Sequence, residues 1–221
     1  SIEPEAFGRV AVEAQSMEKI IIASNIGGSN ETIINEKSGF LFESGNSGKL
    51  SEKIAKYLIN SGHKKISYIA GWEGASTQRD REAGFRFILN EAGIKLHSRR
   101  IGNFVLEESR EATRSMFSDK HPDAVFVAND HMALAVMDTL RYELGLKIPD
   151  DVSIIGYDDV PAASWPSFLL TTVQQPVNIM VRETVEILIE KIDNAYARPQ
   201  KIKIDGPLIL RNSTKTQKGY I

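Results

Sequence analysis

The chain has 221 residues, of which 42% are hydrophobic and 25% charged, and it contains no cysteine. These proportions are ordinary for a globular protein long enough to bury a full core, and the lack of cysteine excludes disulfides and thiol chemistry. With 27 basic and 29 acidic residues the net charge is −2, so the basic excess typical of nucleic-acid surfaces is missing and we expect no nucleic-acid partner.

Location is predicted from what the sequence lacks. No run approaches the roughly 18 apolar residues of a membrane span, and no signal peptide opens the chain. We therefore expect no membrane partner and a cytoplasmic location, which a cysteine-free chain suits. The chain begins at Ser1 rather than at methionine, which favours a fragment of a longer protein.

The predicted elements alternate short β-branched runs with amphipathic helices, beginning in residues 1–50. A helix is predicted over 5–17, after Pro4, followed by strands over 19–24 and 39–42. The turn at 44–48 is the best candidate domain boundary. The run KLSEKIAKYLINSGH, which follows it, predicts one uninterrupted helix.

Later in the chain the same alternation continues. Strands are predicted over 65–70, 124–128, 152–156, 170–174 and 207–211, and helices over 78–92, 130–144 and 177–193. Near-continuous apolar strands indicate burial on both faces. The pattern predicts an α/β fold, Rossmann-like or flavodoxin-like, with a layered and mainly parallel sheet, helices on both faces, and the option that both parts of the chain share one chimeric sheet.

Two features near the C-terminus complete this prediction. The helix over 177–193 carries an apolar stripe that we expect to face a core, formed by Val177, Met180, Val181, Val185, Leu188, Ile189 and Ile192. Residues 215–221 are predicted to be a frayed tail.

Three polar clusters stand where predicted strands give way to helices, and carboxyl ends of parallel strands form the usual ligand crevice. The clusters are Arg79 with Arg81, Asn129 with Asp130, and Asp158 with Asp159. Paired donors and acceptors of this kind suit a neutral polyhydroxylated or heterocyclic ligand. Each cluster also has a purely structural interpretation, as a helix cap, a turn or an ion pair. Three clusters on one sheet edge favour the ligand interpretation.

From residue 51 to 214 a series of motifs resembles the LacI/GalR family of transcription regulators. The motifs are AKYLINSGHKKISYIAG, QRDREAGF, DAVFVANDHMALAVM, IPDDVSIIGYDD, LTTVQQP and LILRNST, in the family's order. The resemblance implies a periplasmic-binding-protein-like C-terminal lobe that contacts an effector through Arg81, Asn129, Asp158 and Gln175, with Phe104 as an aromatic wall. The family's DNA-binding headpiece and most of its N-terminal lobe have no counterpart in this sequence.

Residues 1–50 instead resemble part of the C-terminal Rossmann domain of group 1 GT-B glycosyltransferases. The resemblance rests on Glu5 and Glu13 in the pattern E-x-F-G-x-x-x-x-E-A, and on the runs KIIIASN and GFLFESGN. It implies that Glu5 is a vestigial donor-sugar ligand and that Glu13 lies near the nucleotide ribose. Without the resemblance, Glu5 is a favourable first-turn residue and Glu13 a solvated one, about 12 Å further along the helix.

The transferase resemblance is too incomplete for catalysis, since the acceptor domain and the basic residues that would hold a diphosphate are missing. We therefore expect no enzyme activity, no catalytic residue and no cofactor. The four histidines, His63, His97, His121 and His131, show no metal-ligand spacing, so no metal is expected.

Together the two resemblances predict an engineered or recombined chimera of two Rossmann-like fragments without an intact native activity. In this hypothesis residues 1–50 cover the helix over 177–193. One alternative is a truncated effector-binding lobe of a LacI/GalR regulator that binds a sugar or nucleoside-like molecule weakly, with a homodimer left open. The second alternative is a remnant of a nucleotide-sugar glycosyltransferase.

Overall fold

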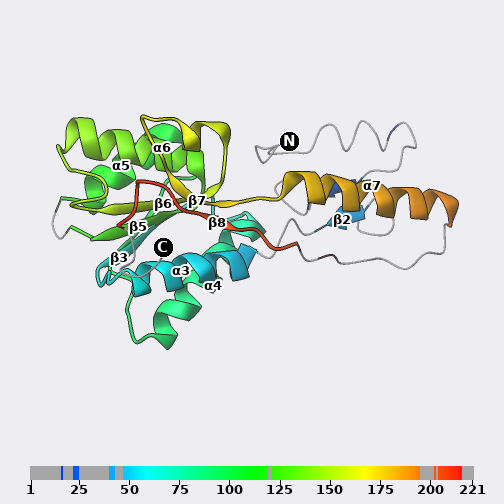
Figure 1. Cartoon of the computed structure of the whole chain (residues 1–221), viewed down its shortest axis with the longest axis horizontal. Coiled ribbons are helices and arrows are strands. Elements are labelled where there is room, and N and C mark those ends of the chain that lie inside the picture. The colour runs from blue at the N-terminus through cyan, green and yellow to red at the C-terminus, as the bar shows by residue number, and fades with distance from the viewer. Residues whose placement is uncertain are drawn as a thin grey trace. The chain divides into compact units, whose positions relative to one another are not determined.

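The computed structural model describes residues 22–24, 40–42, 47–118, 121–194 and 204–215, together with the single residues 16 and 202 (Figure 1). The chain divides into two compact units. The first comprises Ser1–Asn46, Gly74–Thr77 and Pro176–Asp205, and the second comprises Ser47–Glu73, Gln78–Gln175 and Gly206–Ile221. Most of the predicted helix over 5–17, and all of 216–221, lie outside the described residues.

The second unit is built on a six-stranded sheet with the order β4-β3-β5-β6-β7-β8. The strands are β3 (Ile66–Ala70), β4 (Arg99–Ile101), β5 (Ala124–Val127), β6 (Ser153–Asp158), β7 (Thr171–Gln174) and β8 (Leu208–Ile209). All neighbours pair in parallel except β7 and β8, which are antiparallel. β3 lies between β4 and β5. The chain therefore adds β4 on one side of β3 and all later strands on the other side, so the strand order reverses at β3. The predicted mainly parallel α/β fold is confirmed.

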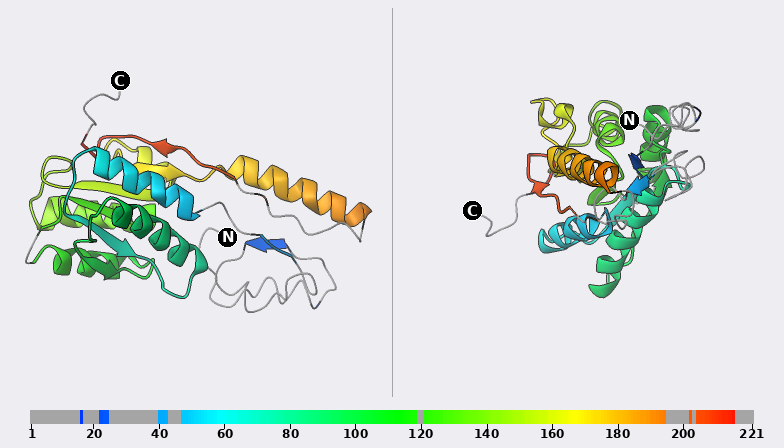
Figure 2. Two further views of the ribbon diagram at one scale, coloured as in Figure 1. Left: turned by 90° about the horizontal axis from the view of Figure 1, so that it is seen from below. Right: turned by 90° about the vertical axis from the view of Figure 1, so that its right-hand side faces the viewer.

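Helices cover both faces of this sheet. The helices α5 (Leu106–Met116) and α6 (Asp130–Asp138) lie on one face, and α3 (Ser47–Asn60) and α4 (Ser76–Glu91) lie on the other (Figure 1). Seen from below, α3 and α4 lie in front of the strands (Figure 2). The predicted uninterrupted helix after the turn at 44–48 is confirmed by α3. α6 continues into a π-helical turn, Thr139–Glu143.

The core lies between these layers, because strands buried on both faces expose no side chain to water. Every residue of β3 and β5 is buried. Tyr68 and Phe126 from these strands and Phe85 from α4 form an aromatic cluster, in which Phe126 lies 5.0 Å from each of the other two ring centres. This arrangement explains the near-continuous apolar runs of the sequence.

Two elements of the second unit were not predicted. β4 has the sequence RRI at an edge of the sheet, and its two arginines are half-exposed. Charged residues are common on edge strands, so this segment lacks the alternation of apolar and polar residues from which a strand is predicted. α5 has the sequence LEESREATRSM, in which few apolar residues mark the buried face. α4 begins at Ser76, two residues before the predicted start at 78.

The first unit contains β1 (Ile22–Ser24), β2 (Phe40–Phe42) and α7 (Val177–Asp193). Among the described strands, β1 and β2 pair only with each other, in parallel. The option of one chimeric sheet is therefore wrong for these residues: their pairing is satisfied within a separate two-stranded sheet.

The bounds of α7 match the predicted helix, but its orientation does not follow the predicted stripe. Val177, Val181 and Ile189 are 58%, 56% and 53% exposed. Met180 and Leu188, which belong to the predicted stripe, are more protected, as is Thr184, which does not belong to it. Apolar residues occur on more than one side of this helix, so hydrophobic periodicity alone does not select the covered side. No helix among the described residues is long and apolar enough to cross a membrane.

Candidate functional site

Arg81 of α4 lies nearly buried at the carboxyl ends of β5 and β6. Its Nη1 donates a hydrogen bond of 2.6 Å to the carbonyl oxygen of Ala128, directly after β5. Its Nη2 lies 3.6 Å from Oδ1 of Asp158, at the end of β6, and its Cζ lies 3.8 Å from the ring centre of Tyr157. One guanidinium group thus connects the carboxyl ends of two neighbouring strands.

The Nε atom of Arg81 is buried and has no hydrogen-bond partner within the described part of the chain. Buried polar atoms are normally paired, and the carboxyl edge of a parallel sheet is the usual position of a ligand site.

Asp158 faces Arg81 and is fixed from a second side by Gln175. Gln175 donates from Nε2 to Oδ1 of Asp158 at 2.6 Å, and its backbone N–H donates to the carbonyl oxygen of Asp158 at 3.3 Å. Burial raises the pKa of Asp158, while Arg81, the hydrogen bond from Gln175 and the charge of His131 oppose the rise. The φ angle of Asp158 is +124°, a conformation that non-glycine residues rarely adopt.

Asn129 immediately follows Ala128, and its side chain caps α6. Its Oδ1 accepts a hydrogen bond of 3.0 Å from the backbone N–H of Met132. The predicted capping role is confirmed. The cap uses only the oxygen, so the side-chain NH₂ group is compatible with a second role as a donor.

Phe104 lies in the turn between β4 and α5, with a φ angle of +61°. Its ring packs against Gly71, directly after β3, so closely that a Cβ atom on Gly71 would lie 2.1 Å from the ring. Phe104 is partly buried against the core. It therefore presents an aromatic ring at the same edge of the sheet as Arg81.

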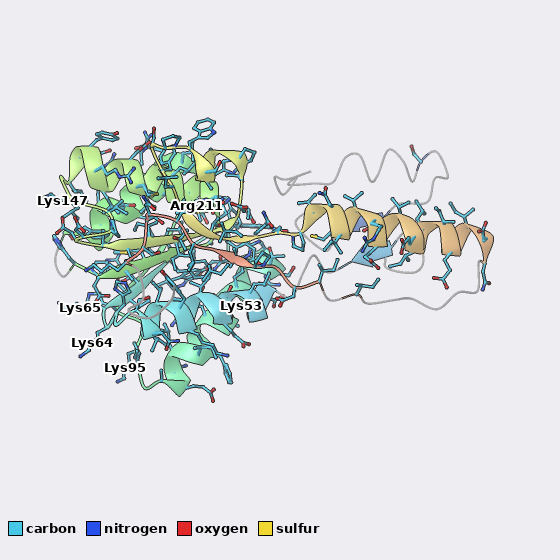
Figure 3. The ribbon with its side chains drawn as sticks, viewed as in Figure 1. Lys53, Lys64, Lys65, Lys95, Lys147 and Arg211 are labelled. Atoms are coloured by element: carbon cyan, nitrogen blue, oxygen red, sulfur yellow. The ribbon has the colours of Figure 1, made fainter. Side chains whose placement is uncertain are left out.

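The loop after β6 is held in place by side-chain contacts that the sequence did not indicate. Asp159, with a φ angle of +58°, accepts from Nη2 of Arg211 and from Nε2 of Gln174, both at 2.7 Å. Arg211, labelled in Figure 3, is distant in sequence and was assigned no role. Tyr157, which adjoins Asp158, was also assigned no role from the sequence. The guanidinium of Arg81 lies over the ring of Tyr157.

The structure brings together three of the predicted site residues, Arg81, Asp158 and Gln175, through direct contacts. Asn129 and Phe104 belong to turns at the same edge of the sheet. Arg79 points elsewhere, donating to the carbonyl oxygen of Glu73 at 3.1 Å. Glu5 and Glu13 lie outside the described residues. In the described part of the chain, no group of three or more His, Asp or Glu side chains is placed to hold a metal ion.

Residues 55–214 match the family described as "Periplasmic binding protein-like domain". Residues 1–70 match the family described as "Glycosyl transferases group 1", so both predicted resemblances are confirmed.

The curated relatives similar to this chain include transcriptional repressors. The "HTH-type transcriptional repressor PurR" of Photobacterium profundum is 35% identical over 163 residues, which cover 72% of this chain and 48% of the relative. The protein of the same name from Haemophilus influenzae is 37% identical over 167 residues, covering 73% and 49%. The chain thus spans about half the length of the curated relatives it matches.

Solved structures of regulators share the fold. A "transcriptional regulator CelR-cellobiose complex" gives a TM-score of 0.81 at 24% identity, covering 93% of this chain and 69% of the other. A lac repressor dimer bound to operator gives a TM-score of 0.75 at 24% identity, covering 94% and 70%.

These similarities favour the alternative hypothesis, an effector-binding lobe, over a chimera without native activity. The periplasmic binding protein-like family matches residues 55–214, and the repressor relatives cover 72% and 73% of the chain. The relatives bear the names of repressors rather than of enzymes. The engineered or recombined origin finds no support here.

Proposed function

Because the chain belongs to the periplasmic binding protein-like domain family, we propose that it is the effector-binding part of a cytoplasmic transcription regulator. The ligand site lies at the carboxyl edge of the six-stranded sheet. The contact of Arg81 with Ala128 and Asp158 is the single observation that carries this proposal. A guanidinium beside a partly exposed carboxylate offers donors and an acceptor to the same ligand.

The chemistry of the site favours a neutral polar ligand, a sugar or a nucleoside. Asp158 and Gln175 present carboxylate and amide groups, which accept from and donate to hydroxyls. Phe104 offers a ring face on which an apolar ligand surface stacks. A cation is disfavoured beside Arg81, and an anion beside Asp158, because each would meet a like charge. Cellobiose, which the similar CelR complex contains, belongs to the same chemical class.

The proposal is tested by ligand binding to the full chain. We expect calorimetry, supported by ligand-observed NMR for weak binders, to detect at least one member of a panel that contains cellobiose, glucose, ribose, adenosine and hypoxanthine. Asp158→Ala is expected to lower the affinity at least about tenfold, the size of one lost hydrogen bond to a charged group.

The matched control is Asp150→Ala, which removes an exposed carboxylate from the loop before β6. It is expected to leave the affinity unchanged. Binding that survives Asp158→Ala at full strength would contradict the assigned site, and no binding by any member of the panel would contradict the ligand class.

We further propose that the chain forms a homodimer through an apolar surface beside the π-helical turn. Tyr142 is 80% exposed and Trp165 57% exposed, so both rings are accessible to a partner. Arg141 donates to the carbonyl oxygen of Ser167, which ties together the two segments that carry these rings. Light scattering of Tyr142→Glu is expected to show a monomer at concentrations where the unsubstituted chain is a dimer. Equal masses would contradict this surface.

A further inference from the structure

Asp130, the first residue of α6, is fully buried and has two hydrogen bonds that point away from its own helix. Its Oδ1 accepts from the hydroxyl of Thr172 on β7 at 2.7 Å, and its Oδ2 accepts from the backbone N–H of Val160 at 3.0 Å. Val160 follows Asp158 and Asp159 in the loop after β6. The carboxylate of Asp130 thus joins α6 to β7 and to the loop that follows Asp158, the proposed ligand-binding residue.

The sheet is shaped to admit this carboxylate. A Cβ atom on Gly156 would lie 2.1 Å from Oδ1 of Asp130. Gly156 and Thr172 are register partners on β6 and β7. Asp130 therefore lies over this pair of residues, two positions before β6 ends at Asp158. A glycine in the interior of a strand commonly marks such a close approach.

The loop that Asp130 holds is strained. Asp158 and Asp159 have φ angles of +124° and +58°, which cost energy for residues with a side chain. Such a conformation persists only where surrounding contacts fix it. Asp159 is fixed by Arg211 and Gln174, as described above, and Val160 by Asp130.

Burial of Asp130 has an electrostatic consequence. Burial raises its pKa to about 7; the hydrogen bonds from Thr172 and Val160 oppose this rise, and the charges of Asp158 and Asp159 add to it. Asp158 and Asp159 each have a cationic partner. Arg81 faces Asp158, and Arg211 pairs with Asp159. The neighbour on α6, His131, acts on Asp158.

We propose that Asp130 is a positioning residue of the ligand site: it fixes the strained loop through Val160 and so holds the carboxylate of Asp158 toward Arg81. This role rests on the proposed function, but the conformation of the loop is measurable without any ligand. Neither the carboxylate nor the fully buried Thr172 is expected to touch the ligand.

Three variants separate this role from a general effect on folding. Asp130→Ala removes both hydrogen bonds. Asp130→Asn keeps an oxygen for Val160 and a donor for the hydroxyl of Thr172, so it is the conservative rescue. Thr172→Val is the matched control, because it removes the other hydrogen bond and leaves the bond to Val160 in place. If Asp130→Ala does not fold, Asp130→Ser, whose hydroxyl is too short to reach Val160, replaces it.

The first readout is the amide NMR spectrum of the full chain without ligand. Asp130→Ala is expected to shift or broaden the signals of Asp158, Asp159 and Val160, whereas Asp130→Asn and Thr172→Val leave them near their original positions. The Val160 amide proton of the unsubstituted chain is also expected to move with pH near neutrality, and this movement is lost in Asp130→Asn. Loop signals that respond equally to the alanine and asparagine variants, or to neither, would overturn the proposal.

The second readout is the affinity for cellobiose, or for whichever member of the panel binds the unsubstituted chain. We expect about a tenfold loss in Asp130→Ala and less than about a threefold change in Asp130→Asn and Thr172→Val. An unchanged affinity in a folded Asp130→Ala variant overturns the positioning role. If no member of the panel binds the unsubstituted chain, the ligand class fails, and the loop signals alone decide the role of Asp130.

Discussion

The two edges of the six-stranded sheet hold buried charge in different ways. At the amino edge, His63 precedes β3 and Asp123 precedes β5. Asp123 accepts from the backbone N–H groups of Lys64 and Lys65 at 3.0 Å and 3.1 Å, and its second oxygen lies 3.3 Å from Nδ1 of His63. The two lysines are labelled in Figure 3. Here a carboxylate satisfies backbone donors between two strand ends.

At the carboxyl edge, charged side chains contact one another and a strained backbone. Arg81 faces Asp158, and Asp130 supports the loop in which two successive residues have positive φ angles. Strain of this kind lowers stability and is concentrated at sites where function requires it. The comparison supports the proposal that the amino edge serves folding and the carboxyl edge serves binding, a difference that substitutions can test.

The largest expected effect is that of Arg81→Ala at the carboxyl edge. The substitution leaves the largely buried carboxylate of Asp158 without its cation, and breaking one partner of a buried pair costs about 3–5 kcal/mol. Urea unfolding is expected to show this loss, and calorimetry a loss of ligand affinity of at least about a hundredfold.

The matched control for that variant is Arg86→Ala, on the same helix. The side chain of Arg86 is 42% exposed, and its partner Glu82 keeps a second cation, Arg99. Its removal is expected to change stability by less than about 1 kcal/mol. Equal losses in the two variants would contradict a special role for Arg81.

The second prediction is that the two edges respond oppositely to pH. Burial lowers the pKa of His63, although Asp123 opposes this, so the stability due to the neutral imidazole is present above pH 6.5 and is lost as the pH falls. Burial raises the pKa of Asp130 from 3.8 to about 7, so its contribution is present below pH 3.8 and is lost as the pH rises through about 7.

Unfolding curves measured at pH steps from 4 to 8 check this prediction. His63→Gln is expected to remove a loss of stability on acidification, and Asp130→Asn to remove a gain, each by about 1 kcal/mol per pH unit where the group titrates. His121→Gln, which removes an exposed histidine near the same edge as His63, is the control. Slopes that change in the same direction in both variants would contradict the comparison.

The third prediction concerns Asp123 at the amino edge. Asp123→Ala removes the hydrogen bonds to the N–H groups of Lys64 and Lys65. Both bonds are exposed and water can replace the carboxylate, so the expected cost is only the net value of two hydrogen bonds, about 1–2 kcal/mol of stability in urea unfolding. Ligand affinity is expected to stay the same, because the contact lies at the opposite ends of the strands from Asp158. A fall in affinity at unchanged stability would reverse the assignment of the two edges.

The sequence was sufficient to predict most of the sheet and the residues at its carboxyl edge, because both follow from local patterns. Strands such as β3 and β5 are continuous apolar runs, and Asn129 stands at a helix start. The direct contacts of Arg81 with Asp158 and of Asp158 with Gln175 agree with residues chosen by family resemblance.

The remaining features depend on contacts between distant residues. Arg211 reaches Asp159 across 52 positions, and Asp130 meets Thr172 across 42, with no periodicity to indicate either. The edge strand β4 lacks the apolar alternation of a half-buried strand. The covered side of α7 depends on what packs against the helix, so its several apolar sides did not reveal it.

The smallest expected effect on stability is that of Gly71→Ala, which tests whether the ring of Phe104 serves binding. The new methyl group would lie 2.1 Å from the ring, which must move aside. Phe104 is only partly buried, so the ring moves at a cost of about 1 kcal/mol, at the low end for overpacking. Affinity for the bound sugar or nucleoside is expected to fall about tenfold, because the displaced ring no longer stacks on it. Phe104→Leu in the same chain relieves the clash, so the double variant is expected to recover the stability but not the affinity. Recovery of both would show that the ring is only packing material, and that the carboxyl edge is arranged for folding after all.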